Sequence, residues 1–579
     1  MSNRTEIAEH FNIFFTNIGP SLAAKINSTN VPHFSTYLTR QTEHNFSFAH
    51  VSAQNISTII KELKPKSSTG HDNISMKLLK RIKQVIYGTF ALIVNQSFNT
   101  GIFPSKLKIA KVLPVFKKDD NTIVNNYRQI SLPAFSKVLE KVVYSQLYSF
   151  FTANNLFYKS QHGFKKLHST ETAALEFIDR IFKMLDSGEI PISIFLDLSK
   201  AFDTLDHDIL LYKLNCYGVN GTSLNWFKSY LTNRHQYVQF DDISSETRPI
   251  QTGVPQGSIL GPLLFIIYVN DMHKASSKFE SILYADDTTL VNSLCCFQEN
   301  NASSSKSIST NINNELDKVH DWLAANKLSL NISKTKFMIF HFPQRKIKLD
   351  INLKIVDSPI ERKDNFEFLG LTVHESLHWS DHICKISNKL AKVIGILKRL
   401  RNFLPRKELL QIYNSLFLPH INYCLLAWGY SSDRILKLQK QAIRLVCSAN
   451  YLAHTEPLYK QLHTLKLNDL LQAKALKFYF KYTHHELPKY FDNLFTPQCN
   501  SHPYATRNRD VPYYPIPTRN TTKYSVRFYI PNIISSTPPC IMDKIHTHSY
   551  AGFSKYMKSF FIDSYSEICN IVNCYTCNH

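Results

Sequence analysis

The spacing of apolar residues predicts that this chain mixes α-helices with β-strands. Residues 171 to 186 carry apolar side chains at helical spacing, which is typical of a helix with one stripe in a core. Residues 192 to 196, Ile-Ser-Ile-Phe-Leu, form a largely apolar run that is short enough for a buried strand. Beyond residue 375 the pattern becomes helical, as in the stripe from residue 383 to 397. We therefore expect strands mixed with helices before residue 375 and helices alone for a long stretch after it.

Two strand-like runs flank the acidic pair Asp286-Asp287. An apolar run, residues 282 to 285, precedes the pair, and a β-forming run, residues 288 to 291, follows it. Two such runs joined by two residues predict a β-hairpin with the acids at its tip. An isolated Asp-Asp pair is usually a solvated turn. A second acid, Asp197, changes that interpretation, because it ends the buried apolar strand and a lone carboxylate is costly to bury.

Basic residues follow another pair of predicted strands further upstream. Residues 109 to 116 predict a strand that leads to Lys117 and Lys118, and residues 127 to 132 predict a second one that carries Arg128. Fixed cations on neighbouring strand ends suit a triphosphate, because they offset the charge that develops on the leaving group. The alternative interpretation is a solvated, charged hairpin.

The composition favours a polyanionic partner. The 579 residues include 67 Lys plus Arg against 45 Asp plus Glu, which gives a formal net charge of +22. Such an excess favours nucleic acid before a membrane surface. No apolar run reaches the length of a membrane span, and the N-terminal residues lack a signal-peptide core. The 11 cysteines are scattered, so we expect a reducing, intracellular location, nucleus or cytoplasm, without a membrane partner.

The helical region after residue 375 carries lysines beside its apolar stripe. Lys385, Lys389 and Lys392 lie on other faces of the predicted helix. Basic helices of this kind can follow the phosphates of a duplex, although a solvated surface face would show the same pattern.

From about residue 486 the chain is rich in proline, tyrosine and asparagine, and we expect weaker order there. Its end carries four residues of the types that bind zinc: Cys569, Cys574, Cys577 and His579. Their spacing is poor for a standard zinc module. Unpaired thiols are the default interpretation, and zinc is the alternative.

Three further acids, Asp203, Asp206 and Asp208, precede a predicted helix that carries Ile209 and Leu210. Acidic residues at this position commonly cap a helix. We interpret all three as caps.

The remaining acids and the upstream cations together describe a nucleotide polymerase. Asp197, Asp286 and Asp287 would repel one another unless cations held them together. Oxygen-only ligands suit Mg²⁺, which takes phosphate oxygens as its remaining ligands. Two such ions can activate an attacking hydroxyl and stabilise the leaving oxygen of a phosphoryl transfer. We therefore expect two Mg²⁺ ions, with Mn²⁺ as a substitute.

Five stretches, in order, resemble motifs of reverse transcriptases. They are Phe195 to Asp203, Gly253 to Pro262, Tyr284 to Asp287, Asn331 to Thr335 and Phe368 to Gly370. A sixth stretch, Tyr127 to Leu132, resembles a fingers motif. A single Tyr-Ala-Asp-Asp is a weak indication, whereas five motifs in order are specific. Their order and spacing are similar to those of non-LTR (LINE-type, jockey-like) retrotransposons, from about residue 6 to about residue 490.

The resemblance implies an α+β, right-hand polymerase fold with fingers, a palm that contains an antiparallel sheet, a helical thumb and a less ordered tail. It divides the chain into an N-terminal helical extension (1–60), fingers and palm (61–373), thumb (374–485) and C-terminal tail (486–579). It implies an RNA-directed DNA polymerase that uses an RNA template, a DNA primer and dNTPs, and leaves the oligomeric state open. It also implies that the upstream endonuclease of such elements is lacking. The alternative is a catalytically silent remnant that binds RNA or RNA–DNA duplex.

The resemblance assigns roles to the residues of the reaction centre. Asp197, Asp286 and Asp287 would bind the two metals, with the carbonyl of Leu198 as an extra ligand. Lys334 would give a proton to the pyrophosphate leaving group.

It also assigns a nucleotide pocket. Lys117 and Arg128 would contact the triphosphate, and Phe202 would lie under the sugar. Gln256 and Gly257 would line the pocket.

Phe368, Leu369 and Gly370 would grip the primer end. Two departures from the family pattern lie near Arg128. Gln129 stands where the family usually has proline, and Pro133 is also unusual.

Overall fold

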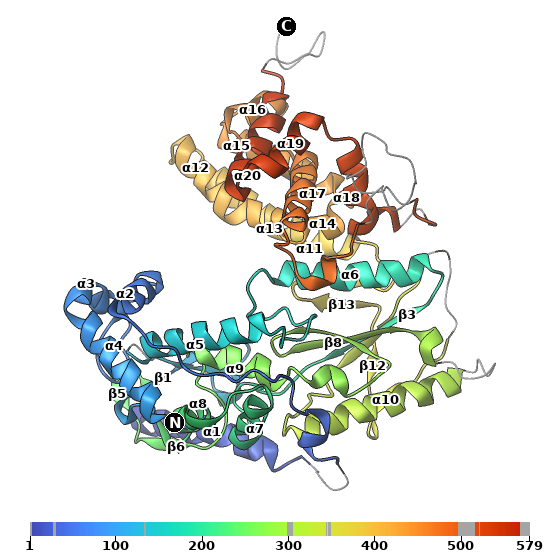
Figure 1. Cartoon of the computed structure of the whole chain (residues 1–579). Helices are drawn as coiled ribbons and strands as arrows, with labels where there is room; N and C mark the ends of the chain where they lie inside the picture. The colour runs from blue at the N-terminus through green and yellow to red at the C-terminus, as the bar shows by residue number, and fades with distance from the viewer. Residues whose placement is uncertain are drawn as a thin grey trace, which may run out of the picture.

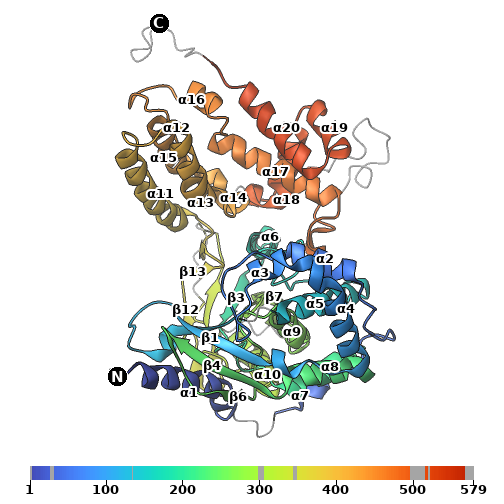
Figure 2. The same cartoon turned by 90° about the vertical axis from the view of Figure 1, so that its left-hand side faces the viewer.

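The computed structural model describes residues 3–26, 31–132, 135–297, 305–342, 344, 349–495, 516–519 and 522–567. In Figure 1 the sheets lie in the lower body, and helices build the upper body. Figure 2 shows the same division from the side, with strand β13 (Asn365–Phe368) close to the junction of the two bodies.

A five-stranded sheet forms the centre of the lower body. Its strands are β3 (Pro191–Leu196), β7 (Glu280–Tyr284), β8 (Asp287–Ser293), β9 (Lys336–Ile339) and β12 (Glu361–Arg362). Their order is β12-β9-β3-β8-β7. β3 pairs antiparallel with both β8 and β9. The hairpin predicted around the acidic pair is the antiparallel β7–β8 hairpin.

The side chains of β3 explain its central place in this sheet. All six of its residues are buried. Ile194 belongs to the core that contains helix α9 (Leu260–Tyr268). Phe195 points to the other face, where its ring centroid lies 5.8 Å from that of Phe177 in α6 (Thr170–Asp186). Helices therefore cover both faces, which is why the strand is a nearly continuous apolar run.

A second sheet in the lower body carries basic residues. Its strands are β1 (Ile109–Phe116), β2 (Tyr127–Ser131), β4 (Arg234–Phe240), β5 (Ile243–Ser244) and β6 (Arg248–Ile250). β1 pairs antiparallel with β2 and parallel with β4, and β4 also pairs with β5 and β6. The N-terminal helix α1 (Arg4–Ala23) packs on this sheet, since Phe11 and Phe15 are buried with Val112 and Val238.

Further helices surround the two sheets. They are α2 (Ala53–Glu62), α3 (Met76–Arg81), α4 (Lys83–Thr100), α5 (Ser136–Ala153), α7 (His207–Cys216), α8 (Gly221–Leu231) and α10 (Ser305–Ala325). Trp226 of α8 and Trp322 of α10 are fully buried in the same core as Ile194. One core thus unites helices from distant parts of the sequence.

Short hairpins precede the helical body. β10 (Lys354–Ile355) pairs with β11 (Ser358–Pro359), and β13 pairs with β14 (Leu371–His374). The helices that follow are α11 (Ser380–Leu400), α12 (Arg406–Ile412), α13 (Leu418–Asn422), α14 (Leu425–Trp428), α15 (Asp433–Val446), α16 (Glu456–Gln461) and α17 (Leu467–Thr483). The apolar stripe predicted on α11 is buried.

Three helices lie where the composition predicts weaker order, and they correct that expectation for their residues. They are α18 (Val526–Ser535), α19 (Pro539–Thr547) and α20 (Tyr550–Asp563). Ile530, Phe553 and Met557 are buried in the core that contains α17. Arg527 also forms a 2.8 Å ion pair with Asp179 of α6. Burial of apolar side chains against α17 and α6 therefore orders a segment whose overall composition is unfavourable.

Some sequence predictions fall outside the described residues. These are the zinc-type residues Cys569, Cys574, Cys577 and His579, and also Pro133. Across the part of the chain that is described, no helix has both the length and the apolarity needed to cross a bilayer.

Candidate active site

The register of β3 and β8 brings Asp197 opposite Asp287. Leu196, the last residue of β3, pairs with Thr288 of β8. The next residue on β3 and the preceding residue on β8 are Asp197 and Asp287, so the antiparallel register sets them across from each other. Asp286 lies in the turn that joins β7 to β8. The structure thus gathers three predicted carboxylates at one end of the central sheet.

These carboxylates disfavour one another's charge. Burial, followed by the charges of Asp286 and Asp197, raises the pKa of Asp287 to about 6. Burial also raises the pKa of Asp286, and Asp197 contributes. Carboxylates that repel in this way gain from a cation between them, and an all-oxygen donor set fits a hard divalent ion. The carbonyl of Leu198, the residue after Asp197, remains a predicted additional ligand.

A short antiparallel bridge holds Lys334 beside Asp197. The amide of Asn331 donates to the Asp197 carbonyl, and the amide of Ser199 donates to the Ser329 carbonyl, both at 2.8 Å. The chain then turns, and the Lys334 ammonium lies 3.4 Å from Asp197 Oδ2. A predicted proton donor and a predicted metal ligand are therefore in direct contact.

Four basic side chains lie close together near the acids, and one of them, Lys200, was not predicted. Lys117 follows β1, and Arg128 lies in β2. Burial lowers the pKa of Lys117, and Arg128 and Lys334 lower it further. Burial also lowers the pKa of Lys200, with contributions from Lys117 and Arg128. Lys200 belongs to the same motif as Asp197, but its motif alone indicated no specific role. Such a group of cations favours an anionic ligand such as a triphosphate.

Asp203 is not a helix cap, which corrects the interpretation from the sequence. Asp206 caps α7, and its carboxylate accepts the amide of Asp208 at 3.0 Å. Asp203 is buried instead, and its carboxylate accepts side-chain amides of Gln129 at 2.7 Å and of Gln256 at 2.8 Å. Burial raises the pKa of Asp203, whereas these two donors lower it. The donors lie 74 and 53 positions away, so no local pattern could indicate them.

The loop that carries Gln256 and Gly257 is held against β2. Gly257 has a φ of +112°, and a Cβ there would lie 2.6 Å from the carbonyl oxygen of Ser131. The Ser131 amide donates to the Gln256 carbonyl at 2.7 Å. This glycine is therefore required by contact with the strand that carries Arg128. The roles of Gln256 and Gly257 towards a nucleotide remain predictions.

Phe202 lies at the junction between β3 and α7. Its ring stacks on Phe265 of α9, with centroids 4.5 Å apart, and meets the edge of Phe164 at 6.1 Å. These are packing contacts of a partly buried aromatic ring. Its predicted place under a sugar remains a prediction.

A cavity of about 660 Å³ joins the acids to the β13–β14 hairpin. The predicted site residues in its lining are Asp197, Asp287, Lys334, Phe368 and Leu369. The Phe368 ring is buried against Phe177, with centroids 4.7 Å apart, so this side chain belongs to the core. The Leu369 carbonyl accepts a hydrogen bond from the Tyr423 hydroxyl. Gly370, with a φ of +85°, completes the exposed tip.

The loop after α5 supports the acidic hairpin, a role that the sequence did not indicate. The His162 amide donates to the Leu283 carbonyl of β7 at 2.7 Å. Gly163 approaches so closely that a Cβ there would lie 2.2 Å from the amide nitrogen of Ala285. The buried His162 ring also contacts the Glu176 carboxylate of α6 at 2.8 Å. In the sequence, Gly163 within a polar loop is the feature that could have indicated this close approach.

Comparison with known proteins identifies the relatives of this chain. Residues 115–373 match the reverse transcriptase (RNA-dependent DNA polymerase) family. The chain is 26% identical over 463 residues to the RNA-directed DNA polymerase from mobile element jockey of Drosophila melanogaster, which covers 76% of this chain and 49% of that protein. It is 25% identical over 472 residues to the probable RNA-directed DNA polymerase from transposon X-element of the same organism, with 79% and 50% covered. The chain spans about half the length of these relatives.

Solved telomerases resemble it more distantly. The telomerase from Candida albicans, in complex with a TWJ fragment of telomeric RNA, has a TM-score of 0.35 and 13% identity, and covers 68% of this chain and 69% of that one. The apo telomerase from Candida tropicalis, truncated from its C-terminal domain, has a TM-score of 0.32 and 11% identity, with 47% and 55% covered.

The fold and the site define an α+β protein with a cluster of three carboxylates at the end of its central, largely antiparallel sheet, an arrangement that agrees with a polymerase palm. Residues 115–373 match the reverse transcriptase family model, and the chain is similar to proteins named as RNA-directed DNA polymerases of the jockey and X-element retrotransposons. The resemblance seen in the sequence motifs is confirmed.

Proposed function

We propose that this chain is an RNA-directed DNA polymerase of a non-LTR retroelement, which adds dNTPs to the 3′ end of a DNA primer on an RNA template. One observation carries the proposal: the β3–β8 register sets Asp197 beside Asp286 and Asp287 inside the matched domain. The names of the relatives agree with this activity. A catalytically silent remnant has less support, because the carboxylates and the cations around them are all present.

Two Mg²⁺ ions, or Mn²⁺ in their place, would be held by Asp197, Asp286 and Asp287, with the carbonyl of Leu198 as an additional ligand. When bound, such ions favour ionisation of the attacking hydroxyl and neutralise charge on the leaving oxygen. The contribution of the chain is to hold the carboxylates together against their repulsion. The raised pKa of Asp287 reflects the cost of that arrangement.

The other groups would bind and orient the substrate. In the reaction the primer 3′ oxygen bonds to the α-phosphorus, and the bond from that phosphorus to the bridging oxygen breaks. Lys117 and Arg128 would offset the charge that passes to pyrophosphate. Lys334, 3.4 Å from Asp197, would give a proton to the pyrophosphate oxygen. The ring of Phe202 would lie beneath the sugar.

The nucleotide and the primer end would meet in the cavity at the acids. Gln256, which is held by Asp203, and Gly257 would form one side of the nucleotide pocket. The hairpin tip at Phe368–Gly370 would position the primer end, since Phe368 and Leu369 line the same cavity as Asp197. Because the Phe368 ring is buried, we assign the primer contact to the backbone and to Leu369.

Residues 61–373 would serve as fingers and palm, residues 374–485 as thumb, and residues 1–60 as an N-terminal extension. Helices α18 and α20 pack on α17, and α19 packs on α20, so we propose that these three helices move with the thumb. The activity would take place in the nucleus or the cytoplasm, where the proposed RNA template, DNA primer and dNTPs occur.

Primer extension tests this function. The full chain is incubated with a labelled DNA primer on an RNA template, dNTPs and Mg²⁺, and then with EDTA in excess. Extension that requires the RNA template and is abolished by EDTA is expected. A folded chain that binds the duplex but extends no primer in Mg²⁺ or Mn²⁺ would instead support the silent remnant.

A further inference from the structure

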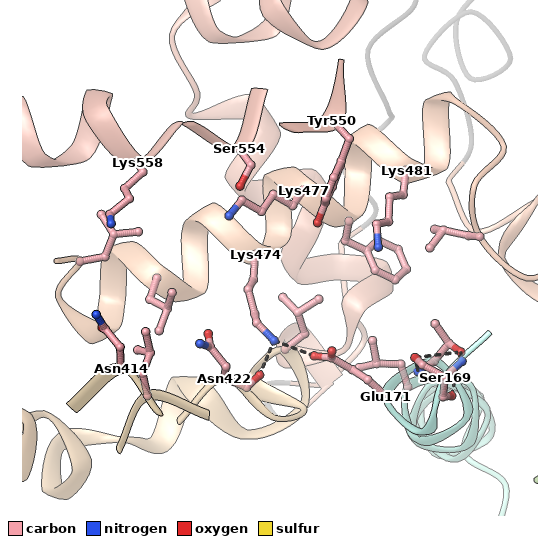
Figure 3. Close-up of a pocket in the computed structure, with 18 of the residues that line it drawn as sticks. Ser169, Glu171, Asn414, Asn422, Lys474, Lys477, Lys481, Tyr550, Ser554 and Lys558 are labelled. Atoms are coloured by element: carbon pink, nitrogen blue, oxygen red, sulfur yellow. Dashed lines mark hydrogen bonds and ion pairs between the residues drawn. The ribbon is translucent and has the colours of Figure 1, made fainter. Parts of the chain in front are cut away.

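A second cavity lies where α6 meets helices of the upper body. It has a volume of about 400 Å³. Among the residues that the structure describes, it shares no lining residue with the cavity beside the acids. Figure 3 shows side chains from several helices pointing into it, with Glu171 contributed by α6 and Ser169 by the N-cap of the same helix. It is therefore a separate site.

Lysines dominate the charged lining of this cavity. They are Lys474, Lys477, Lys481 and Lys558. The first three follow one another at helical spacing on α17, so they share one side of that helix, and Lys558 comes from α20. The acid in the lining, Glu171, forms a 2.8 Å ion pair with Lys474. One carboxylate thus faces four ammonium groups.

The charges of the other lysines are not neutralised by the chain as described. Neither Lys477 nor Lys558 has a carboxylate partner among the described residues. Lys481 lies over the ring of Tyr550, 4.9 Å from its centroid. Burial lowers the pKa of Lys477, and the charges of Lys474 and Lys558 lower it further. An anion between these ammonium groups would offset their repulsion.

Much of the remaining lining is apolar. Leu175 of α6, Leu418 of α13 and Phe478 of α17 belong to it. Asn414 and Asn422 add side-chain amides near the lysines (Figure 3). Small-ligand pockets typically have volumes of roughly 300 to 1,000 Å³. The cavity therefore has room for a ligand that joins a phosphate to a flat ring.

We propose that this cavity binds a nucleotide unit, with its phosphate against Lys477 and Lys558 and its base against the apolar lining. Ammonium groups bind phosphate as point charges. Base rings pack on apolar and aromatic side chains. A free mononucleotide and a single strand of RNA offer the same chemistry. RNA as the source rests on the proposed function, whereas binding of a nucleotide does not.

Amine-reactive footprinting of the full chain tests the site. The probes are AMP and single-stranded oligouridylate RNA, and modification of each lysine is followed by mass spectrometry. Lys477 and Lys558 are expected to react several-fold more slowly with at least one probe. Lys407 of α12 and Lys555 of α20, both exposed, are expected to react at unchanged rates. If AMP protects Lys477 and Lys558, a free nucleotide is sufficient to occupy the cavity. If only the RNA protects them, the ligand is a single strand.

Unchanged rates at Lys477 and Lys558 with both probes would overturn the proposal, and so would equal protection of the control lysines. Paired variants add a second measurement. Lys477→Gln with Lys558→Gln is expected to bind the protecting probe several-fold more weakly, whereas Lys407→Gln with Lys555→Gln is expected to bind as the wild type does. If both double variants lose probe affinity equally, the loss reflects the lower net positive charge of the chain and not this cavity, and the proposal is overturned.

The footprint needs no catalysis, so it separates this proposal from the proposed function. If Lys477 and Lys558 are protected in a chain that extends no primer, the nucleotide site is supported and the polymerase function is contradicted. If the chain extends a primer but neither lysine is protected, the polymerase function is supported and the nucleotide site is contradicted.

Discussion

The side-chain amide of Gln129 donates a 2.7 Å hydrogen bond to the buried carboxylate of Asp203. The same carboxylate accepts the side-chain amide of Gln256 at 2.8 Å, so it joins β2 to the loop before α9. The fingers motif that residues 127–132 resemble usually has proline where this chain has Gln129, and proline has no side-chain donor. Gln129 therefore supplies Asp203, the residue that also binds Gln256, with a hydrogen-bond donor that a proline could not provide.

Replacing Gln129 tests whether this contact positions the nucleotide pocket. Gln129→Leu leaves the buried Asp203 carboxylate with one donor fewer, so the free energy of unfolding is expected to fall by about 1 to 3 kcal/mol. Gln256 would be held less firmly, and the KM for dNTP is expected to rise more than kcat falls. Denaturant unfolding and steady-state kinetics measure the two effects.

Ile130→Leu, at an exposed neighbour of Gln129 on β2, is the control and is expected to change neither quantity. A Gln129→Leu chain with reduced stability and unchanged KM would show a purely structural contact.

The raised pKa of Asp287 predicts how stability depends on pH without metal. Its carboxyl titrates near 3.8 when unfolded and at about 6 when folded, so the folded chain retains the proton longer. Stability conferred by this group is therefore present at low pH and is lost as the pH rises through that window. Asp287→Asn removes this effect. In EDTA, the Asp287→Asn variant is expected to melt at a higher temperature than the wild type. This difference in melting temperature should be larger at about pH 7 than at about pH 4.

A melting difference of the same size at both pH values would contradict the raised pKa. Mg²⁺ provides the complementary measurement. It is expected to stabilise the wild type at neutral pH more than it stabilises Asp287→Asn, because it binds the charged carboxylates.

If the lysines of α11 contact the phosphates of a duplex, binding of the duplex should depend on salt concentration. Lys389 and Lys392 are exposed, whereas Lys385 forms a 2.5 Å ion pair with Glu367. Changing the three lysines to Gln is expected to weaken duplex binding. The slope of log K against log salt should become shallower by about 0.9 for each phosphate that the variant no longer neutralises. Fluorescence anisotropy at several salt concentrations measures this slope, and an unchanged slope would show a solvated face.

The proposed place of the Phe202 ring beneath the sugar leads to a prediction about the choice between ribonucleotides and deoxynucleotides. If its ring blocks a 2′-hydroxyl, Phe202→Val should raise ribonucleotide incorporation relative to deoxynucleotide incorporation. Because the ring stacks on Phe265 at 4.5 Å, the same change is expected to cost about 1 to 3 kcal/mol of stability. The ribo/deoxy ratio of kcat/KM and a thermal melt decide between the two roles. A lowered melting temperature with an unaltered ratio would leave Phe202 with packing alone.

Local patterns in the sequence were sufficient to predict the strands that carry the acids. β3 is a short apolar run that ends at Asp197, and the β7–β8 hairpin has its acids where the two runs meet. The contacts of Asp203 could not be predicted in this way. An acid before a helix has the local pattern of a cap, and its actual partners, Gln129 and Gln256, are distant in the sequence.

Composition also misled where tertiary packing decides the structure. The content of proline, tyrosine and asparagine after residue 486 predicted weak order, but Phe553 and Met557 of α20 are buried in the core shared with α17. The motif that contains Phe368 likewise did not indicate that its ring packs on Phe177, and its place at a primer end stays a prediction. Periodic spacing indicates which face is apolar, but not what covers it.

The most direct test of the carboxylate site is primer extension on one RNA template in Mg²⁺ by the wild type, Asp286→Asn and Asp208→Asn. Asp286→Asn keeps the shape of the side chain but removes the charge that we assign to metal binding, and it is expected to lose nearly all extension while it melts no lower than the wild type. Asp208→Asn makes the same chemical change at an exposed acid in the first turn of α7 and is expected to retain extension. Extension by Asp286→Asn at the wild-type rate would contradict the assignment of these carboxylates to two-metal catalysis.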